Sequence, residues 1–451
     1  MTFLTPTQSQ QATILAKAKP LKTSRAAAAK VISDVLRHHQ SLNGILKPMQ
    51  AALPDNETSF CQQLCYGVIR WHLQLQALAD QLLAKPLRAK DSDINALLLC
   101  GIYQLRSMRL PEHAALSETV SACAALGKPW AKGLINASLR NYQRNQAEFD
   151  RKIIDNPSAQ FAHPDWLIEQ FKTDWPTKWQ SILEANNQQP PMFLRVNQQH
   201  HTGPQYLKIL KQNNITATTV DSVAEAILLD LPCDVYQLPG FTDGHVSVQD
   251  AAAQRVASIL RIAPQQRILD ACAAPRGKTC HILELEPNNT VIALDIDPNR
   301  LTQIIQNTER LKLNATLKSA DAGDVNSWWD GQYFDRILID APCSGSGVIR
   351  RHPDIKALRR PSDIESLVEK QRLLLESLWP LLKPDGLLVY TTCSIIKQEN
   401  EQQILNFLSR HPDAKDDILF PEPATKRPAG YQRLPGENQF DGFFYACLRR
   451  R

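Results

Sequence analysis

The chain has 451 residues, of which 43% are hydrophobic and 22% are charged. A chain of this length divides into two or three domains, and its composition supplies a sizeable core and excludes wholesale disorder. No apolar run approaches the roughly 20 residues that a membrane-spanning helix needs, and the first residues do not resemble a signal peptide. We therefore expect a cytoplasmic protein without membrane association, with a flexible polar tail at residues 1–20.

The charge of the chain is unevenly distributed. Its 51 basic and 46 acidic residues give a formal charge of +5. Residues 1–150 hold 17 Lys and Arg against 10 Asp and Glu, a net charge of +7, whereas the remainder has a net charge of −2. A basic module joined to a near-neutral one favours contact with a polyanion such as nucleic acid, although a solvated basic surface gives the same excess.

Ten cysteines are scattered along the chain without a C-x-x-C pair or a Cys/His cluster of zinc spacing. In a long chain this distribution indicates reduced thiols in a cytosolic protein and predicts no metal site. Cys343 and Cys393 differ from the other cysteines because each lies in a motif at the end of a predicted strand.

The first third of the chain is predicted to be helical. Apolar residues recur at steps of three and four in stretches that begin near Ser24, Thr58 and Asp91, and Pro111 and Gly127 end two of the helical runs. Stripes with this spacing form a core. We therefore expect a compact all-α domain at residues 21–150.

A small α+β connector is predicted at residues 151–240. Strand-like segments at 192–196 and 226–231 lie among short helical stretches, and Pro190-Pro191 and Pro239-Gly240 mark turns.

Residues 241–451 alternate short apolar strands with helical stretches after residue 265. This alternation predicts a mainly parallel α/β sheet with helices on both faces. In such sheets ligands bind beyond the carboxyl ends of the strands, and the chemical motifs of this chain lie at those ends. The strands are expected at RILDAC, VIALD, ATLKSAD, FDRILID, GLLVYTTC and FFYACL.

Three strand-end motifs indicate a cofactor that contains adenosine. The first strand runs into residues 269–279, where small side chains allow a ligand to approach the backbone and a helix N-terminus offers N–H groups. This segment has neither the Walker A spacing nor a full G-x-G-x-x-G pattern, so by itself it also fits a tight strand-to-helix turn. Asp295 ends the second strand and can accept ribose hydroxyls, and Asp321 follows the third strand and can accept an adenine amino group.

Two further motifs place a thiol after the fourth and fifth strands. Residues 339–347 contain Asp340 and Cys343, and residues 390–394 contain Cys393. The fourth and fifth strands are neighbours in a doubly wound sheet, so the two thiols are expected to lie close together. Cysteines that only pack would not need loops rich in Pro, Gly and Ser, which favours a chemical role for the pair.

The sequences LDACAAPRGKT, ALDID, DAPCSGSG and TTCS, in this order, resemble the cytosine-C5 RNA methyltransferases that use S-adenosylmethionine. Residues 244–250 are similar to the start of that family's catalytic domain, residues 350–354 to the stretch after its Pro-Cys motif, and the helical third to its NusB-type RNA-binding domain. The resemblance covers nearly the whole chain after residue 20. It implies a NusB-like N-terminal domain and a Rossmann-like class I methyltransferase domain at residues 241–451.

The resemblance also implies roles for individual residues. Cys393 of the T-C-S motif is the nucleophile that attacks the base, and Cys343 of the Pro-Cys motif assists product release. Asp340 faces the pyrimidine edge, and Lys278 positions groups electrostatically. The residues expected to bind S-adenosylmethionine are Cys272, Ala273, Ala274, Pro275, Arg276, Gly277, Lys278, Asp295, Asp321 and Asp340.

One position departs from the family pattern, which has Gly-Gly-Lys where this chain has Arg276-Gly277-Lys278. If that position requires a positive φ, a non-Gly residue costs about 1–3 kcal/mol. An alternative hypothesis is therefore an RNA-binding assembly or antitermination-type factor with an impaired methyltransferase domain. The retained lysine, carboxylates and thiols argue against that alternative. A DNA cytosine methyltransferase is a third hypothesis, against which the TTCS thiol beside a NusB-like domain speaks.

The resemblance implies that the substrate is 16S rRNA, with cytosine 967 as the target. The RNA is either naked or part of an early assembling small subunit, and the enzyme is expected to be a monomer. The target base must leave any stack to reach a pocket, so a loop or a flipped nucleotide is expected. Four arginines after the Pro-Cys motif are expected to contact RNA phosphates, with a solvated charged face as the alternative. They are Arg350, Arg351, Arg359 and Arg360.

Overall fold

The structure is a computed structural model that describes residues 21–273, 277–417 and 425–451. The expected polar tail and residues 274–276 of the expected cofactor loop lie outside the described residues. Within the described part of the chain, no helix combines the length and apolar character needed to cross a bilayer.

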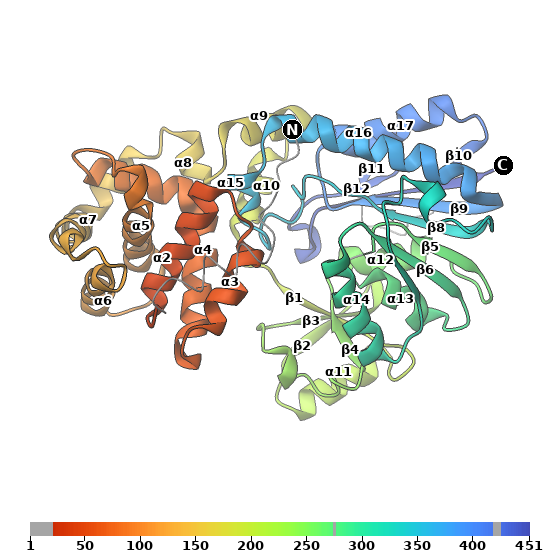
Figure 1. Ribbon diagram of the computed structural model, residues 1–451, viewed down its shortest axis with the longest axis horizontal. Helices are drawn as coiled ribbons and strands as arrows, with labels where there is room; N and C mark the ends of the chain where they lie inside the picture. Colours follow the sequence, from red (N-terminus) through yellow and green to blue (C-terminus); the bar gives the residue numbers. More distant parts are fainter. Residues whose placement is uncertain (1–20, 274–276, 418–424) are drawn as a thin grey trace. The chain divides into compact units, whose positions relative to one another are not determined.

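The chain forms two units (Figure 1). The first extends to Ile168 and also contains residues 352–358, and the second consists of residues 169–351 and 359–451. The helical unit therefore continues past residue 150, where the sequence places its end.

Apolar stripes on successive helices build the core of the helical unit. Val31 and Ile32 of α2, Leu64 of α4 and Leu97 and Leu98 of α5 are fully buried, as the three- and four-residue spacing predicts. The helices are α2 (Ser24–His38), α3 (Leu42–Ala51), α4 (Asp55–Leu82), α5 (Ser92–Ser107), α6 (Glu112–Ala125), α7 (Lys132–Lys152), α8 (Pro157–Phe161) and α15 (Ile355–Leu358), and α9 (Asp165–Asp174) runs across the unit boundary.

Helix α2 starts at Ser24, as predicted, whereas the start of α4 differs from the predicted one. Helix α4 begins at Asp55 rather than after Thr58, because Asp55 and Glu57 place carboxylates in the first turn, where the helix dipole favours negative charge. At α2 the N-cap is Thr23, and the neighbouring Ser24 instead hydrogen-bonds through its backbone N–H and its hydroxyl to the Glu57 carboxylate.

Residues 352–358 complete the helical unit although they come from the second half of the chain. Lys356 is 3% exposed, and its Nζ donates to the backbone carbonyls of Arg70 and Ala162 at 2.8 and 2.9 Å. The Asp354 carboxylate accepts the backbone N–H of Leu42 at 3.0 Å. Burial lowers the pKa of the Lys356 ammonium. No periodicity in the first third of the chain could reveal this insertion.

The connector forms a four-stranded antiparallel sheet in the order β2-β3-β1-β4. Leu194, Val196, Tyr206, Leu210 and Ile227 form its core. Because β4 lies beyond residue 240, this sheet extends past the predicted end of the connector. Its elements are α10 (Trp179–Asn187), β1 (Met192–Val196), α11 (Gly203–Gln212), β2 (Ala217–Val220), β3 (Val223–Leu229) and β4 (Val246–Val248).

The rest of the second unit is built on a nine-stranded sheet in the order β11-β12-β13-β9-β8-β5-β6-β7, with β10 paired to β13. Strands β5 to β9 are parallel, and β13 returns antiparallel to β9. Figure 1 shows these strands in green to blue with helices beside them. The predicted mainly parallel α/β fold is confirmed.

Each strand predicted for this domain is present. The strands are β5 (Arg267–Asp270), β6 (Thr290–Asp295), β7 (Thr316–Ser319), β8 (Phe334–Asp340), β9 (Leu382–Thr392), β10 (Ala414–Asp416), β11 (Thr425–Lys426), β12 (Tyr431–Arg433) and β13 (Phe443–Arg450). The helices are α12 (Ala251–Ile259), α13 (Lys278–Leu285), α14 (Pro298–Leu311), α16 (Pro361–Leu378) and α17 (Glu401–Arg410).

Candidate active site

The two thiols of the strand-end motifs lie together at the carboxyl ends of β8 and β9. Asp340 and Thr391 are register partners in these parallel strands, so both following loops leave the sheet at the same edge. The Sγ atoms of Cys343 and Cys393 are 3.5 Å apart, and the two residues are 9% and 1% exposed. The Gly347 N–H donates to the Cys393 carbonyl at 2.9 Å and ties the loops together. The two thiols therefore lie in contact with each other at this edge of the sheet.

A buried ion pair lies at the same edge of the sheet. Lys278, the first residue of α13, places Nζ 2.7 Å from Oδ2 of Asp340, the last residue of β8. Each side chain is 3% exposed. Lys278 Nζ also lies 5.3 Å from the centroid of the Phe443 ring, a cation–π contact. Desolvation makes a buried pair a weak source of stability, so stability alone does not account for this pair.

Asp270 adds a carboxylate that the sequence interpretation did not assign to the site. It ends β5, is fully buried, and accepts the Thr279 hydroxyl at 2.6 Å. Burial, with help from Asp340 and Asp295, raises the pKa of Asp270 to about 7. Its Oδ1 atom has no hydrogen-bond partner among the described residues. An acidic last residue of the first strand was the signal in the sequence that could have identified it.

The carboxylates at these strand ends act electrostatically on the Cys272 thiol. Burial and then the charges of Asp340, Asp270 and Asp295 raise the pKa of Cys272 well above its ordinary value. Cys272 therefore remains a neutral thiol that lines the site. Ala273 is 2% exposed, and its N–H donates to the Leu294 carbonyl at 2.8 Å.

These residues fit S-adenosylmethionine, which carries a positive sulfonium and a positive ammonium. Three aspartates lie at the ends of β5, β6 and β8. The buried Oδ1 atom of Asp270 can accept a hydrogen bond from a ligand. A buried carboxylate oxygen without a hydrogen bond is costly unless a ligand compensates it. Arg276, the departure from the family pattern, lies outside the described residues.

Asp295 and Asp321 follow neighbouring strands, as the sequence predicts. Asp295 is 4% exposed at the end of β6, accepts the Asp297 N–H at 2.9 Å and lies 3.3 Å from the Arg300 guanidinium. Asp321 follows β7, is exposed, and accepts the N–H of Gly323 at 2.9 Å. Both carboxylates therefore lie at the edge of the sheet where the sequence predicts the cofactor.

We expect Asp295→Ala to weaken the binding of S-adenosylhomocysteine by about 1.5–3 kcal/mol, the scale of a hydrogen bond to a charged group. Isothermal titration calorimetry measures this loss directly. Asp297→Asn is the matched control, because it removes a charge two residues away but preserves a side chain that can cap α14. Equal affinities of Asp295→Ala and wild type would contradict the assignment of Asp295.

Arg350 does not fulfil the expected role in RNA binding. It is 2% exposed, and its guanidinium donates to the Asp441 carboxylate at 2.8 Å and to the Gln439 carbonyl at 2.7 Å. Arg351 pairs with the same Asp441 and with Asp250. Burial and the nearby Asp441 carboxylate raise the pKa of Asp250 to about 6 despite both guanidiniums. The expected phosphate contact of Arg350 is therefore corrected to an internal ion-pair network, which Arg351 shares.

Arg359 and Arg360 lie in different environments. Arg359 is half-buried and donates to the carbonyls of Ser344 and Cys343 at 3.1 and 3.2 Å, so it supports the loop that carries a catalytic candidate. Arg360 is exposed at the start of α16. Of the four arginines, Arg360 is the one whose exposure fits a contact with RNA phosphate.

Glu399 links the two thiol loops, and sequence reasoning missed it. Its carboxylate accepts the Ser344 N–H at 2.7 Å, the Ser344 hydroxyl at 2.6 Å, and the Ser394 hydroxyl. Gln371 donates a further hydrogen bond at 3.1 Å. Glu399 is fully buried, and burial raises its pKa. Ser344 and Ser394 each follow one of the two cysteines, so this carboxylate fixes the thiols relative to each other.

We expect Glu399→Gln to lower kcat by about 100-fold, because the amide replaces an acceptor oxygen by donors and shifts the two loops. The KM for RNA should change little, because Glu399 is buried beneath the loops. Glu401→Gln is the matched control, since Glu401 pairs with Arg427 instead. Steady-state methylation kinetics with both variants measure the difference; equal kcat values would rule out the positioning role.

Comparison with known proteins agrees with the fold. A family model described as 16S rRNA methyltransferase RsmB/F matches residues 257–449, a ferredoxin-like domain model of the same family matches 163–236, and the NusB family model matches 22–144. The Vibrio cholerae protein named ribosomal RNA small subunit methyltransferase B is 47% identical over 427 residues, which cover 95% of this chain and 97% of that protein.

Two solved structures share the fold. The structure titled PH0851 has a TM-score of 0.77 at 22% identity and covers 94% of this chain and 99% of its own. A methyltransferase homolog from Pyrococcus horikoshii has a TM-score of 0.58 at 26% identity and covers 65% of this chain and 97% of its own.

A mainly parallel sheet with helices beside it and aspartates at the ends of successive strands is the fold of a methyltransferase that uses S-adenosylmethionine. The helical unit is NusB-like, and the small antiparallel sheet is ferredoxin-like. The chain belongs to the RsmB/F family of 16S rRNA methyltransferases.

Proposed function

We propose that the enzyme methylates C5 of a cytosine in 16S rRNA through a covalent adduct between Cys393 and the base. The observation that carries this proposal is the 3.5 Å pair of thiols beside the buried Lys278–Asp340 pair. One thiol would suffice for a nucleophile alone. Two thiols at one strand-end site suit a reaction that both forms and breaks a carbon–sulfur bond.

The chemistry of cytosine explains why a thiolate is needed. C5 is too poor a nucleophile to accept a methyl group unaided, and addition of the Cys393 thiolate to C6 makes C5 enamine-like. S-adenosylmethionine, when bound, would supply an electrophilic methyl group on sulfonium. The activated C5 would accept that methyl group as the sulfur–methyl bond breaks, and S-adenosylhomocysteine would leave. Finally the C5 proton is removed with the help of Cys343, the C6–sulfur bond breaks, and Cys393 regains its thiolate.

Asp340 and Lys278 supply the remaining chemistry in this proposal. The Asp340 carboxyl faces the pyrimidine edge and stabilises a proton at N3, which draws electrons away from C6 and promotes addition. Lys278 holds the Asp340 carboxylate through the 2.7 Å contact and keeps it oriented. A pair with low exposure acts without the screening that water would impose.

The NusB-like domain positions the RNA in this proposal, and the methyltransferase domain receives the flipped target base. The net charge of +7 in residues 1–150 supports contact with phosphates. We place the target at cytosine 967 by family resemblance, in RNA that is naked or part of an early assembling subunit. We also propose that the enzyme is a monomer and acts in the cytoplasm.

The alternative is a factor that binds RNA but has an impaired methyltransferase domain. S-adenosylhomocysteine calorimetry on the wild-type chain separates the two, because a factor of that kind binds the nucleoside weakly or not at all. The gathered aspartates and the paired thiols favour the enzyme.

Bisulfite sequencing of 16S rRNA tests the proposal directly. We expect one cytosine to lose its protection in a strain that lacks the protein and to regain it when the wild-type chain is supplied. A chain carrying Cys393→Ala is the negative control. Full protection in the deletion strain, or rescue by Cys393→Ala, would refute the proposed reaction.

A further inference from the structure

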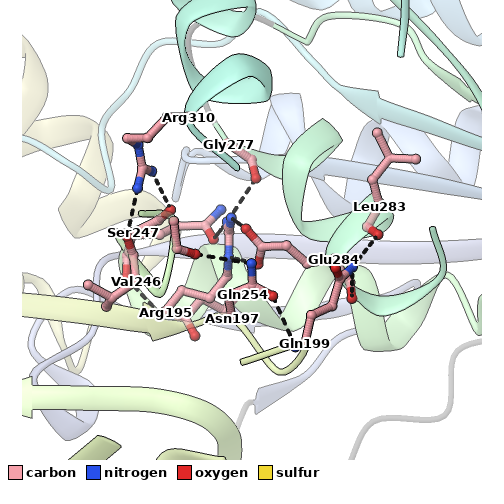
Figure 2. A network of polar contacts seen from close by, with 12 residues as sticks. Arg195, Asn197, Gln199, Val246, Ser247, Gln254, Gly277, Leu283, Glu284 and Arg310 are labelled. Carbon is pink, nitrogen blue, oxygen red and sulfur yellow. Dashed lines mark hydrogen bonds and ion pairs between the residues drawn. The ribbon is translucent and has the colours of Figure 1, made fainter. Parts of the chain in front are cut away.

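Arg195, in strand β1 of the ferredoxin-like sheet, is buried against the methyltransferase domain. Its side chain is 1% exposed. Figure 2 shows its guanidinium between Gly277 and Glu284. Nη1 donates to the Gly277 carbonyl at 2.8 Å, and Nε and Nη2 donate to the two carboxylate oxygens of Glu284 at 2.9 and 2.6 Å. One side chain thus binds two points that are seven residues apart.

Both points belong to the helix that begins the proposed cofactor site. Gly277 is the N-cap of α13, and Glu284 lies near the end of that helix. Gln199, just after β1, donates to the carbonyls of Leu283 and Glu284 at 3.2 and 3.0 Å. The ferredoxin-like domain therefore holds both ends of α13, as Figure 2 also shows.

The start of α13 carries two groups of the site. Lys278 follows Gly277 and reaches the Asp340 carboxylate, and Thr279 donates to Asp270 at 2.6 Å. A shift of the Gly277 carbonyl would move both side chains relative to the strand ends. Little space is available at this contact, because a Cβ added to Gly277 would lie 3.3 Å from Arg195 Nη1.

Stability alone does not explain these charges. A buried ion pair can often be replaced by apolar side chains without loss of stability. A guanidinium, however, can bind a carboxylate through two donors and still direct a third donor at a carbonyl. Arg195 makes both kinds of contact, with the Glu284 carboxylate and with the Gly277 carbonyl.

We propose that Arg195 is a positioning residue for the cofactor: it sets the Gly277 carbonyl and the first turn of α13, and so makes the ferredoxin-like domain part of the support of the cofactor site. This role rests on the proposed placement of the cofactor beside Lys278. It gives the ferredoxin-like domain a function beyond that of connecting the RNA-binding and catalytic domains. It requires cofactor affinity to depend on a residue that does not touch the cofactor.

Calorimetric titration with S-adenosylhomocysteine tests this role. Arg195→Met would leave Glu284 buried without its partner, so the informative variant is the double substitution Arg195→Met/Glu284→Leu, which removes both charges. We expect this variant to keep a thermal midpoint near that of wild type and to bind the nucleoside about tenfold more weakly. Arg195→Lys keeps the charge but not the fork of donors, and should lose affinity about threefold.

Arg310→Met is the matched control. Arg310 contacts the carbonyls of Phe241 and Val246 and the Ser247 hydroxyl at 2.7, 3.0 and 2.9 Å, and none of these hydrogen bonds reaches α13. Its substitution should leave nucleoside affinity unchanged. RNA affinity, measured without nucleoside by filter binding, should be unchanged in all variants.

Two results would overturn the role of Arg195. The first is wild-type nucleoside affinity in the folded double variant, or in Arg195→Lys should the double variant fail to fold. The second is an equal loss of affinity in Arg310→Met, which would indicate general loosening between the domains. Absence of nucleoside binding by the wild-type chain would instead refute the proposed function and this role with it.

Discussion

Cys343→Ala is expected to accumulate a covalent protein–RNA complex, whereas Cys393→Ala should form none. Removing the attacking thiol stops the reaction before any bond forms. Removing the release thiol permits addition and methyl transfer and then stalls before elimination. Both variants should lose turnover by about 1,000-fold or more. Because the two Sγ atoms are only 3.5 Å apart, a difference between the two variants reports on the chemical role of each thiol rather than on its location.

Denaturing gel electrophoresis of each variant with labelled 16S rRNA measures the adduct. An RNA with 5-fluorocytosine at the target should trap the wild-type enzyme as well, because fluorine cannot leave C5 as a proton does. Cys447→Ala is the matched control, since Cys447 is equally buried but lies in β13. Trapping by Cys393→Ala and not by Cys343→Ala would reverse the roles, and no adduct in any case would exclude covalent catalysis.

Asp340→Asn is expected to lower kcat by about 10²- to 10⁴-fold, the range of a positioned proton-transfer group. The amide cannot stabilise a proton at N3, and it leaves the ammonium of Lys278 buried without a carboxylate partner. The second effect should also lower the free energy of unfolding by about 3–5 kcal/mol. Activity is therefore measured at a temperature at which circular dichroism shows the variant folded.

Asp335→Asn provides the matched control for that experiment. Asp335 lies near the other end of β8 and also pairs with a lysine, Lys383, at 2.8 Å. Because this pair is more exposed and lies away from the thiols, its loss should alter turnover by less than about twofold. Trapping with 5-fluorocytosine RNA separates the steps: Asp340→Asn should form the adduct slowly. Wild-type kcat in folded Asp340→Asn would exclude Asp340 from the chemistry.

Much of the fold could be predicted from local patterns. Helical spacing near Ser24 and Asp91 corresponds to α2 and α5, and short apolar runs correspond to β5, β6, β8 and β9. A strand end is also a local feature, so Asp295, Asp340 and both thiol loops could be placed at one edge of the sheet before their distances were known. The strand order then converts two positions 50 residues apart into a 3.5 Å contact.

The contacts of charged side chains could not be predicted in the same way. From the sequence, Arg350 is expected to be a surface cation after a catalytic loop. In the structure it is buried, because it pairs with Asp441, which is 91 residues away. The contacts of Glu399 and Arg195 could not be predicted either. Glu399 binds Ser344, which is 55 residues away, and Arg195 binds Glu284, which is 89 residues away. Their roles depend on neighbours that meet only after folding.

The sequence by itself therefore determined the class of each domain, the strand-end positions of the aspartates and the pairing of Cys343 with Cys393, because periodicity and strand order act locally or through a known topology. Tertiary structure alone decided which charges are buried, which carboxylate joins the two thiol loops, and which segment completes the helical unit. The physical reason is that burial and ion pairing are set by residues distant in the chain. An arginine exposed to water can bind a phosphate, whereas an arginine beside a buried aspartate stabilises the fold.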